Sequence, residues 1–341
     1  ELWLKLENCA PLRSLISNNA AMLTLRIFGE NVFKSAVVNT VVVLLQRATD
    51  VDKLTIEMDG SNWSMPTKTW KSATLLEVDY RLRPEKSGLI DKIKTMGIPL
   101  ENFGDAIQGI TPYDKYRGQS ANLIKTRAFH FDHKHDATCG KWLSGKDVNR
   151  YSLDWSGEWL SYGSWLAAPR EPRYFTGPRL LFREVPGRDK RIQATAAKEE
   201  TFYHGHSITP FKPHSENPHS YLYLLGLVNS KLLSWYGQLM LPNFGKDIFP
   251  KLNPQDILKL PLRPIDFTIS TEKSNYDQIV DAVDQMLTYH EKLANAKTPQ
   301  EKTFLERQIT ATDAQIDRLV YDLYNLTPEE IKIVEASIPA E

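Results

Sequence analysis

A short histidine-rich segment offers the sharpest candidate for metal chemistry. It reads His130-Phe-Asp-His133-Lys-His135-Asp136, and Cys139 follows closely. Imidazole and thiolate side chains are the ligands that zinc prefers in tetrahedral sites. The spacing matches no common zinc finger, and no second Cys-x-x-Cys pair accompanies it. Two hypotheses therefore stay open: a zinc-dependent enzyme, or histidines that lie in a solvated loop or contact nucleic acid.

Arginine and aromatic residues interleave between Trp159 and Arg191. Arginine forks onto phosphates or guanine edges, whereas aromatic rings stack or wedge, so this pattern suits nucleic acid. In the alternative, Trp165, Phe175 and Phe182 form the core and the arginine stems merely run along it. The arginines that we expect to contact a polyanion are Arg170, Arg173, Arg188 and Arg191.

The sequence contains none of the common loop motifs that bind cofactors or carry nucleophiles. The chain contains no G-x-G-x-x-G, no G-x-x-x-x-G-K-[ST] and no G-x-S-x-G. It also lacks Asn-Pro-Pro followed by Tyr or Phe, the loop with which amino-methyltransferases hold a flipped base. If the chain belongs to an enzyme, its catalytic chemistry lies outside these 341 residues.

Length and composition indicate an ordinary globular protein with more than one module. The 341 residues exceed the roughly 250–300 at which one hydrophobic core stops growing. The 41% hydrophobic and 25% charged content argues against disorder. The longest apolar run, residues 36–45, is too short to span a bilayer, and we expect no membrane partner and no signal peptide. Two distant cysteines suit a reducing cytoplasm, and the start at Glu1 suggests a fragment.

The zero net charge conceals a division along the chain. Residues 1–101 carry 13 Lys and Arg against 12 Asp and Glu, residues 102–265 carry 22 against 15, and residues 266–341 carry 7 against 15. A basic middle suggests that only this part faces a polyanion, whose phosphates Lys and Arg contact. Chance clustering on solvated faces is the alternative.

The elements that must position these residues fall into four segments. Residues 1–60 predict the end of an α/β domain, with strands at 22–28, 37–45 and 53–58 and a helix ending near 16; the apolar run 37–45 favours a strand covered on both faces. Residues 61–101 predict a connector with a short helix at 87–96. Residues 102–265 predict short strands and long loops, including a strand at 179–185, with one helix at 221–236. Residues 266–341 predict antiparallel helices, two of them starting at Thr298-Pro-Gln-Glu and Thr327-Pro-Glu-Glu.

Several segments, in order, resemble adenine-specific DNA methyltransferases of the type IIG restriction-modification class and the related phage-exclusion enzymes. Leu25–Leu45 resembles the last strands of their catalytic domain. Gly104–Pro112 resembles the opening of their TaqI-like target-recognition domain. Further parts of that domain are resembled by Leu143–Tyr151 and Trp159–Gly163, and its closing helix and strand by Tyr223–Leu232 and Lys259–Leu262. Ile316–Val334 resembles their helical tail and is the most specific piece.

The resemblance implies a mixed α/β fold: the end of a doubly wound methyltransferase sheet at 1–60, a connector at 61–101, a target-recognition domain at 102–265 and a helical tail at 266–341. It also implies that S-adenosylmethionine and the catalytic loop belong to an upstream methyltransferase domain of the same parent chain, which extrudes an adenine from double-stranded DNA. No cofactor is expected within the present chain. Its part would be to decide which adenine is used, by gripping phosphates and reading base edges.

The recognition loops of this family vary with the DNA sequence, so the resemblance assigns no base-reading residue. From side-chain chemistry we expect polar and basic loop residues to touch DNA as a group. They are Lys115, Arg117, Asn122, Lys125, Lys146, Asn149, Arg150, Tyr162, Arg170, Arg173, Arg188, Arg191, His204, His206, Asn243 and Lys246. The competing hypothesis is a structural module without DNA binding, whose terminal helices would dock a partner through an exposed apolar stripe along residues 277–325.

Overall fold

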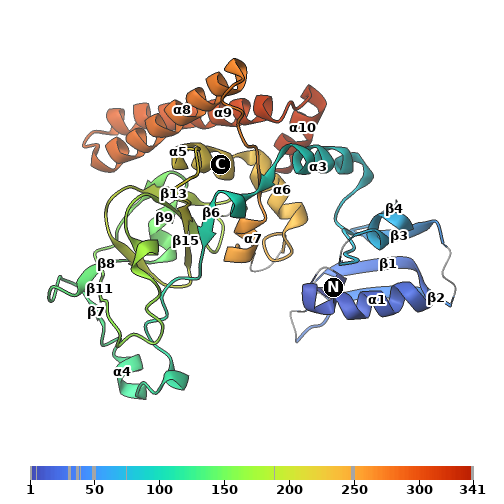
Figure 1. Cartoon of the computed structure of the whole chain (residues 1–341), viewed down its shortest axis with the longest axis horizontal. Coiled ribbons are helices and arrows are strands. Elements are labelled where there is room, and N and C mark those ends of the chain that lie inside the picture. Colours follow the sequence, from blue (N-terminus) through green and yellow to red (C-terminus); the bar gives the residue numbers. More distant parts are fainter. Residues whose placement is uncertain are drawn as a thin grey trace. The chain divides into compact units, whose positions relative to one another are not determined.

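The computed structural model (Figure 1) describes residues 2–4, 6–29, 32–35, 38, 40–47, 51–73, 75–187, 189–246 and 250–338. The chain folds into two compact units. Unit 1 comprises residues 1–92 and 238–248, and unit 2 comprises residues 93–237 and 249–341. Helices and several sheets occur together, which confirms the mixed α/β class. The four-part division expected from the sequence stays a prediction.

Unit 1 is built on one four-stranded sheet of order β2-β1-β3-β4. Strand β1 pairs antiparallel with β2 and parallel with β3. Its core is formed by Leu25, Leu54 and Trp70, and Ile16 of helix α1 packs against that cluster. The elements are β1 (Ala21–Gly29), β2 (Thr40–Gln46), β3 (Lys53–Met58), β4 (Ser61–Pro66), α1 (Ala10–Asn19), α2 (Thr67–Lys71) and the part of α3 (Pro84–Met96) that precedes residue 93. The predicted strands at 22–28 and 53–58 and the helices near 16 and at 87–96 are confirmed.

The prediction that the apolar run 37–45 is covered on both faces is wrong for its described residues. Strand β2 lies at an edge of the sheet, and Val42 and Leu44 are each 55% exposed. Edge strands of soluble proteins usually carry charged or polar residues, because an open apolar edge invites association. The apolar sequence of β2 thus reflects a surface that unit 1 does not cover by itself.

Unit 2 contains two four-stranded sheets, of order β14-β8-β11-β7 and β13-β12-β15-β6. Two apolar clusters lie against these sheets, one around Leu160 and Phe175 and one in which Leu143 of the first sheet packs with Leu181 of the second. Strand β12 confirms the strand predicted near residue 179. The strands are β5 (Ile98–Pro99), β6 (Gly104–Ala106), β7 (His130–Phe131), β8 (Cys139–Leu143), β9 (Val148–Asn149), β10 (Ser152–Leu153), β11 (Trp159–Ser161), β12 (Arg179–Arg183), β13 (Ala194–Ala197), β14 (Phe202–His204), β15 (Ile208–Pro213) and β16 (Pro261–Leu262).

The single helix predicted at 221–236 is two helices, α5 (Tyr221–Asn229) and α6 (Lys231–Met240). Ser230 separates them with an extended backbone, and its hydroxyl donates to the Leu227 carbonyl and accepts from the Leu233 N–H. A serine side chain can satisfy backbone groups locally in this way, which favours a helix boundary over continuation. The break lets the buried Asn229 amide bond both the N–H and the carbonyl of Ala194 on β13.

The C-terminal helices are α8 (Ser270–Asn295), α9 (Pro299–Leu323) and α10 (Pro328–Ser337), and a short α7 (Pro254–Leu258) precedes them. Both predicted helix starts are confirmed, since Thr298 and Thr327 accept hydrogen bonds from Glu301 and Glu330. Helices α8 and α9 lie over α5 (Figure 1), and Ile279, Val283 and Ile316 of their apolar stripe are fully buried. The docking hypothesis requires an exposed apolar stripe, and at these three residues the stripe is buried within the chain. Within the described part of the chain, no helix combines the length and apolar character needed to cross a membrane.

Candidate nucleic-acid interface

Three turns meet at one end of the unit 2 sheets. The turns contain Gly109, Gly145 and Gly205. A Cβ atom on Gly109 would lie 2.1 Å from the Gly205 carbonyl oxygen, so only glycine allows these backbones to approach so closely. The Ile110 N–H donates to the His204 carbonyl at 2.9 Å, and a Cβ atom on Gly145 would lie 3.1 Å from the Ser207 side chain. We call this region the loop end and define it as residues 109–111, 144–146, 170, 184, 205–207 and 251.

Arg170 is held over the loop end by its own backbone and by neighbours. Its φ angle of +67° lies in the left-handed region, which is strained for an arginine. Its Nε donates to the Gly109 carbonyl at 3.3 Å, and its carbonyl accepts from the Tyr162 hydroxyl at 2.8 Å. The guanidinium is otherwise exposed, so one planar cation projects from a fixed point.

His206 completes this cluster from the third turn. Its Nε2 lies 2.8 Å from the Thr111 hydroxyl, and its side chain is partly exposed. Partial burial, and next the charge of Arg170, lower the pKa of His206 below its ordinary value. The ring is therefore neutral near pH 7, with one nitrogen available as donor and one as acceptor. Donors and acceptors of this kind suit base edges as well as phosphates.

Two lysines border the same region. Lys146 is exposed and lies in the turn that touches Ser207. Glu184 donates its N–H to the Ser207 carbonyl, and its carboxylate pairs with Lys251 Nζ at 3.0 Å. The loop end thus presents Arg170 and Lys146 with no ion-pair partner among the described residues, beside one paired lysine. This arrangement can bind an anionic backbone.

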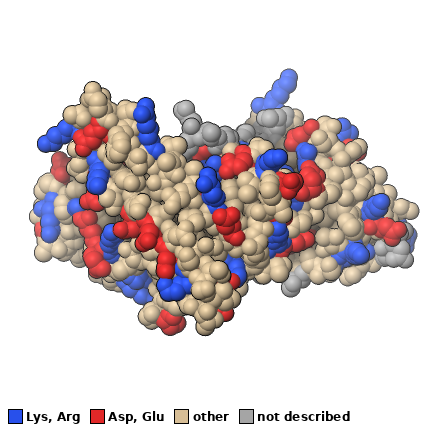
Figure 2. Space-filling view, turned by 90° about the horizontal axis from the view of Figure 1, so that it is seen from above, with Lys and Arg blue, Asp and Glu red and all other residues tan. Residues whose placement is uncertain are grey.

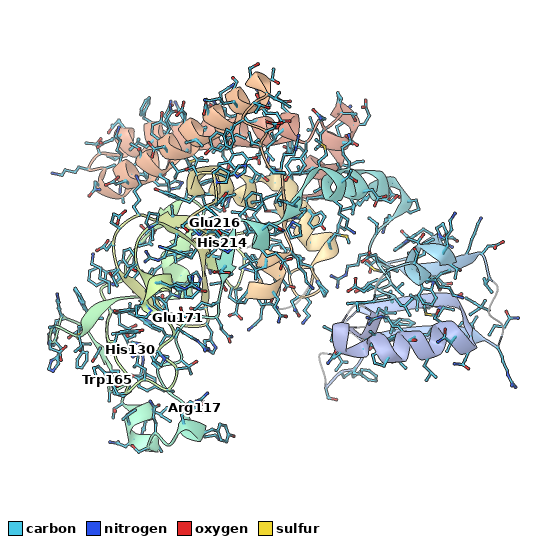
Figure 3. All side chains as sticks on the ribbon, in the orientation of Figure 1. Arg117, His130, Trp165, Glu171, His214 and Glu216 are labelled. Atoms are coloured by element: carbon cyan, nitrogen blue, oxygen red, sulfur yellow. The ribbon has the colours of Figure 1, made fainter. Side chains whose placement is uncertain are left out.

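A second group of predicted residues shares one protruding lobe, which we call the α4 lobe (residues 112–128; Figure 3). It contains the 3₁₀ turn Lys115–Arg117 and helix α4 (Ala121–Lys125). The predicted residues that it exposes to solvent are Lys115, Arg117, Asn122 and Lys125. Figure 3 labels Arg117 on this lobe. Gln119 ties the lobe to the neighbouring loop, because its amide donates to the Trp165 carbonyl at 3.2 Å.

Two further predicted residues are engaged by protein groups. Arg173 is exposed, but its guanidinium pairs with Glu171 at 3.0 Å and Asp105 at 3.5 Å, which offsets its charge. Tyr162 is half-buried, stacks on Tyr203 with ring centroids 4.4 Å apart, and donates to the Arg170 carbonyl. Tyr162 therefore positions Arg170 from behind.

Three predicted DNA contacts are corrected, because Arg150, Arg191 and His204 are buried. Burial lowers the pKa of His204 to about 3, and the charge of Arg179 acts in the same direction. His204 packs its ring against Phe175, with centroids 5.1 Å apart. A histidine and two arginines in a basic sequence look alike whether they face water or the core, so the sequence pattern could not separate them.

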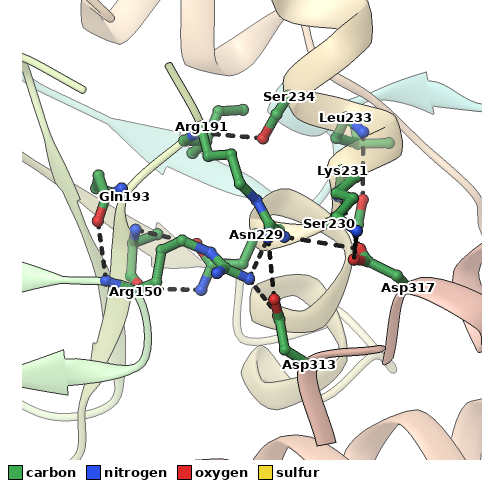
Figure 4. Close-up of polar contacts among 12 residues, drawn as sticks. Arg150, Arg191, Gln193, Asn229, Ser230, Lys231, Leu233, Ser234, Asp313 and Asp317 are labelled. Carbon is green, nitrogen blue, oxygen red and sulfur yellow. Dashed lines mark hydrogen bonds and ion pairs between the residues drawn. The ribbon is translucent and has the colours of Figure 1, made fainter. Parts of the chain in front are cut away.

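Arg150 and Arg191 instead form a buried polar network with α9 (Figure 4). Both donate to the carboxylate of Asp313, and Arg191 lies 2.9 Å from it. Both also donate to the Asn229 carbonyl, at 3.4 Å and 2.8 Å. Asp317 accepts from the Lys231 N–H and lies 3.7 Å from Arg191. The two arginines therefore fasten β9 and β13 to the helical tail.

The remaining predicted residues lie elsewhere. Arg188 is outside the described residues. Asn149 is half-buried in β9, next to Arg150. Asn243 and Lys246 are partly exposed and belong to unit 1, not to the unit that forms the loop end.

The histidine-rich segment does not converge on a metal site. His130 is bonded to the Tyr113 hydroxyl at 2.8 Å and lies edge-on to Trp142. His133 pairs with Asp132, and His135 stacks on Phe131. Among the residues that the structure describes, no three His, Cys, Asp or Glu side chains are grouped to hold a metal ion.

Charge on the α8–α9 face contrasts with the loop end. Lysine and arginine side chains alternate there with aspartate and glutamate, without a continuous basic patch (Figure 2). Sequence reasoning missed Thr111 of the loop end and Tyr116 and Gln119 of the α4 lobe. The sequence signal near Gln119 is the pair Asp114 and Gly118, residue types that favour a tight turn.

Comparisons with known proteins identify a specificity domain in part of the chain. Residues 140–262 match the family model of the TaqI-like C-terminal specificity domain, which confirms the expected target-recognition domain. No curated protein matches the sequence. The type IIL restriction-modification enzyme MmeI, solved in complex with DNA, is similar in fold, with a TM-score of 0.55 and 12% identity over 95% of this chain and 46% of that chain. The type IIG restriction endonuclease BpuSI aligns with a TM-score of 0.38 and 10% identity over the same shares. The chain thus spans about half the length of these enzymes.

Proposed function

We propose that this chain, which carries a TaqI-like specificity domain over residues 140–262, recognises the target sequence for an adenine-specific DNA methyltransferase of a restriction-modification system. The observation that supports this most is the loop end. Lys146 and His206 lie within the matched segment, as does Arg170, and each projects from a turn fixed by backbone contacts. A specificity domain has to present donors and acceptors at fixed positions, because base edges are read by geometry.

The chemistry of the loop end fits a double helix. Lys146 supplies a point charge for a phosphate, whereas the planar guanidinium of Arg170 can bond two acceptors at once, as guanine presents in the major groove. Thr111 and His206 add hydroxyl and imidazole groups that can donate or accept. Phosphate contacts fix the register and the other groups read the sequence.

The catalytic part would come from an upstream domain of the parent chain. Because the 341 residues hold no dinucleotide-type glycine loop and no Asn-Pro-Pro-Tyr loop, we place the S-adenosylmethionine site and the methyl transfer in that domain. The exposed apolar residues Val42 and Leu44 on β2 support an adjoining domain that covers this face of the unit 1 sheet. In the cytoplasm, such an enzyme would serve defence against phage DNA.

Binding of labelled duplex DNA by the purified chain tests the proposal. Since the recognition sequence is unknown, the probe is a pool of random-sequence duplexes, followed by fluorescence anisotropy. The logarithm of the binding constant should fall linearly with the logarithm of the salt concentration. Lys146→Ala should reduce the magnitude of this slope by about one. Lys302→Ala on α9 is the matched control and should leave the slope unchanged. Absence of duplex binding even at low salt would refute DNA recognition by this chain.

The adenine assignment has its own test. The chain joined to its upstream domain and supplied with S-adenosylmethionine should produce methyladenine in the DNA, detected by nucleoside chromatography. Methylcytosine in its place would overturn that assignment while leaving DNA recognition intact.

A further inference from the structure

The α4 lobe presents an unusually exposed aromatic side chain between two cations. Tyr116 is 84% exposed, and it lies between Lys115 and Arg117 in one 3₁₀ turn. Successive residues of a 3₁₀ turn point about 120° apart, so the two cations are splayed to either side of the ring. Lys115 Nζ lies 4.8 Å from the Tyr116 ring centroid, which keeps positive charge close to the aromatic face.

The turn is rigid although its side chains are exposed. Asp114 caps it, because its carboxylate accepts from the Tyr116 N–H at 2.8 Å. Gly118 ends it with a φ angle of +80°, a left-handed conformation that suits glycine. The Asp114 carboxylate is thus occupied by the backbone and leaves the outer surface of the turn to the aromatic ring and the two cations.

Gln119 braces the turn from below with three hydrogen bonds. Its carbonyl oxygen accepts from the Asp114 N–H at 2.8 Å, and its amide donates to the Pro112 carbonyl at 3.1 Å and the Trp165 carbonyl at 3.2 Å. Nearby, the Tyr113 hydroxyl accepts from the Phe129 N–H and bonds the His130 ring. A loop held by so many bonds loses little conformational entropy on binding.

We propose that residues 115–117 are a preformed DNA-contact element. Lys115 and Arg117 bind phosphates, and Tyr116 packs its ring against the bases or sugars between them. This inference rests on the proposed function and adds a second contact region to the loop end. Two cations that flank an exposed ring match the alternation of anionic backbone and stacked bases in DNA.

Anisotropy titrations with the full chain and the random duplex pool distinguish the roles of the three side chains. The double substitution Lys115→Ala/Arg117→Ala should lower the magnitude of the salt slope by about two, since each phosphate contact contributes about 0.9. Tyr116→Ala should weaken binding about 5- to 150-fold with an unchanged slope, because stacking is not ionic. Tyr116→Phe should retain most of the affinity.

Gln119 is a positioning residue, and a mutant cycle tests that role. Gln119→Ala should weaken binding in the wild-type background and have a much smaller effect in the Lys115→Ala/Tyr116→Ala/Arg117→Ala background, because it acts through the three side chains of that turn. Equal effects in both backgrounds would show that Gln119 does not act through residues 115–117 and would overturn its positioning role.

Matched controls lie on α9, where Phe304 is 60% exposed and Lys302 and Arg307 are exposed. Phe304→Ala and Lys302→Ala/Arg307→Ala should bind DNA as the wild type does. If the wild type binds but Tyr116→Ala and the Lys115/Arg117 double variant match these controls, the inference is overturned and the proposed function stands. If the wild type binds no duplex, both fall.

Discussion

Replacing Asp313 with alanine should destabilise unit 2 far more than removal of an exposed charge. One carboxylate receives hydrogen bonds from Arg150 and Arg191, whose side chains are only 9% and 2% exposed. Without it, two buried guanidinium groups face the Asn229 carbonyl and, in the case of Arg191, the more distant carboxylate of Asp317. Removing one partner of a buried ion pair costs about 3–5 kcal/mol, because the remaining charge is buried without compensation.

This loss is measurable as a melting temperature. For a unit of roughly 150–250 residues, 1 kcal/mol corresponds to about 2–4 °C, so Asp313→Ala should lower Tm by about 6–20 °C. Differential scanning calorimetry provides the measurement, and urea titration checks that the free energy of unfolding falls in parallel.

The matched control is Asp277→Ala on α8. Its carboxylate pairs with Lys273 Nζ at 2.6 Å, but both side chains are about half exposed. Helix pairs of this kind contribute about 0.3–0.5 kcal/mol, which gives a Tm change of about 1–2 °C. Equal Tm values for Asp313→Ala and Asp277→Ala would refute the claim that the buried network fastens the sheets to α9.

Three further predictions concern single residues. Burial raises the pKa of Asp317 to about 6, so its stabilising contribution is complete below its ordinary pKa near 4 and is lost as the pH rises through about 6. The Tm of Asp317→Asn minus the Tm of the wild type should therefore increase between about pH 4 and pH 7, because asparagine does not titrate. A Tm difference that stays constant over this pH range in thermal melts would contradict the prediction. Arg170→Gly and Arg170→Ala should weaken duplex binding equally in anisotropy titrations, but the glycine variant should melt about 2–4 °C higher, because it relieves about 1 kcal/mol of left-handed strain that alanine keeps. Gly109→Ala should cost about 1–3 kcal/mol in urea titrations and weaken DNA binding by separating the turns, whereas Gly88→Ala, whose added Cβ meets nothing within 4 Å, should cost nothing; equal stability of these two glycine variants would show that the close approach of the turns is unimportant.

Local sequence signals predicted those features of the fold that depend on local chemistry. The helix starts at Thr298 and Thr327 follow from side chains that cap their own backbone, so neighbouring residues suffice to predict them. The break at Ser230 was missed, because the apolar periodicity continues through it while a hydroxyl ends the helix. The exposure of β2 was missed for a different reason, since composition reports that a strand will be covered but not which part of the protein covers it.

The site was predicted in part for the same reason. Arg170, Lys146 and His206 were expected from their chemistry. The structure brings Lys146 and His206 together from two turns of the loop end, and Arg170 joins them by bonding the Gly109 carbonyl of the third. Arg191 has identical chemistry but lies opposite Asp313, which is 122 residues away in sequence. Long-range pairing of this kind leaves no trace in local composition, so the sequence could not distinguish a DNA contact from a core ion pair.

The buried network also bears on how specificity could be exchanged between such proteins. The segment that matches the specificity domain ends at residue 262, yet Arg150 inside it is neutralised by Asp313, 163 residues further along the chain. Transfer of residues 140–262 alone into a related protein would bring Arg150 and Arg191 without the Asp313 carboxylate that they bond. A viable cassette should extend through α9, or the host should already present an aspartate at the corresponding point of its own tail.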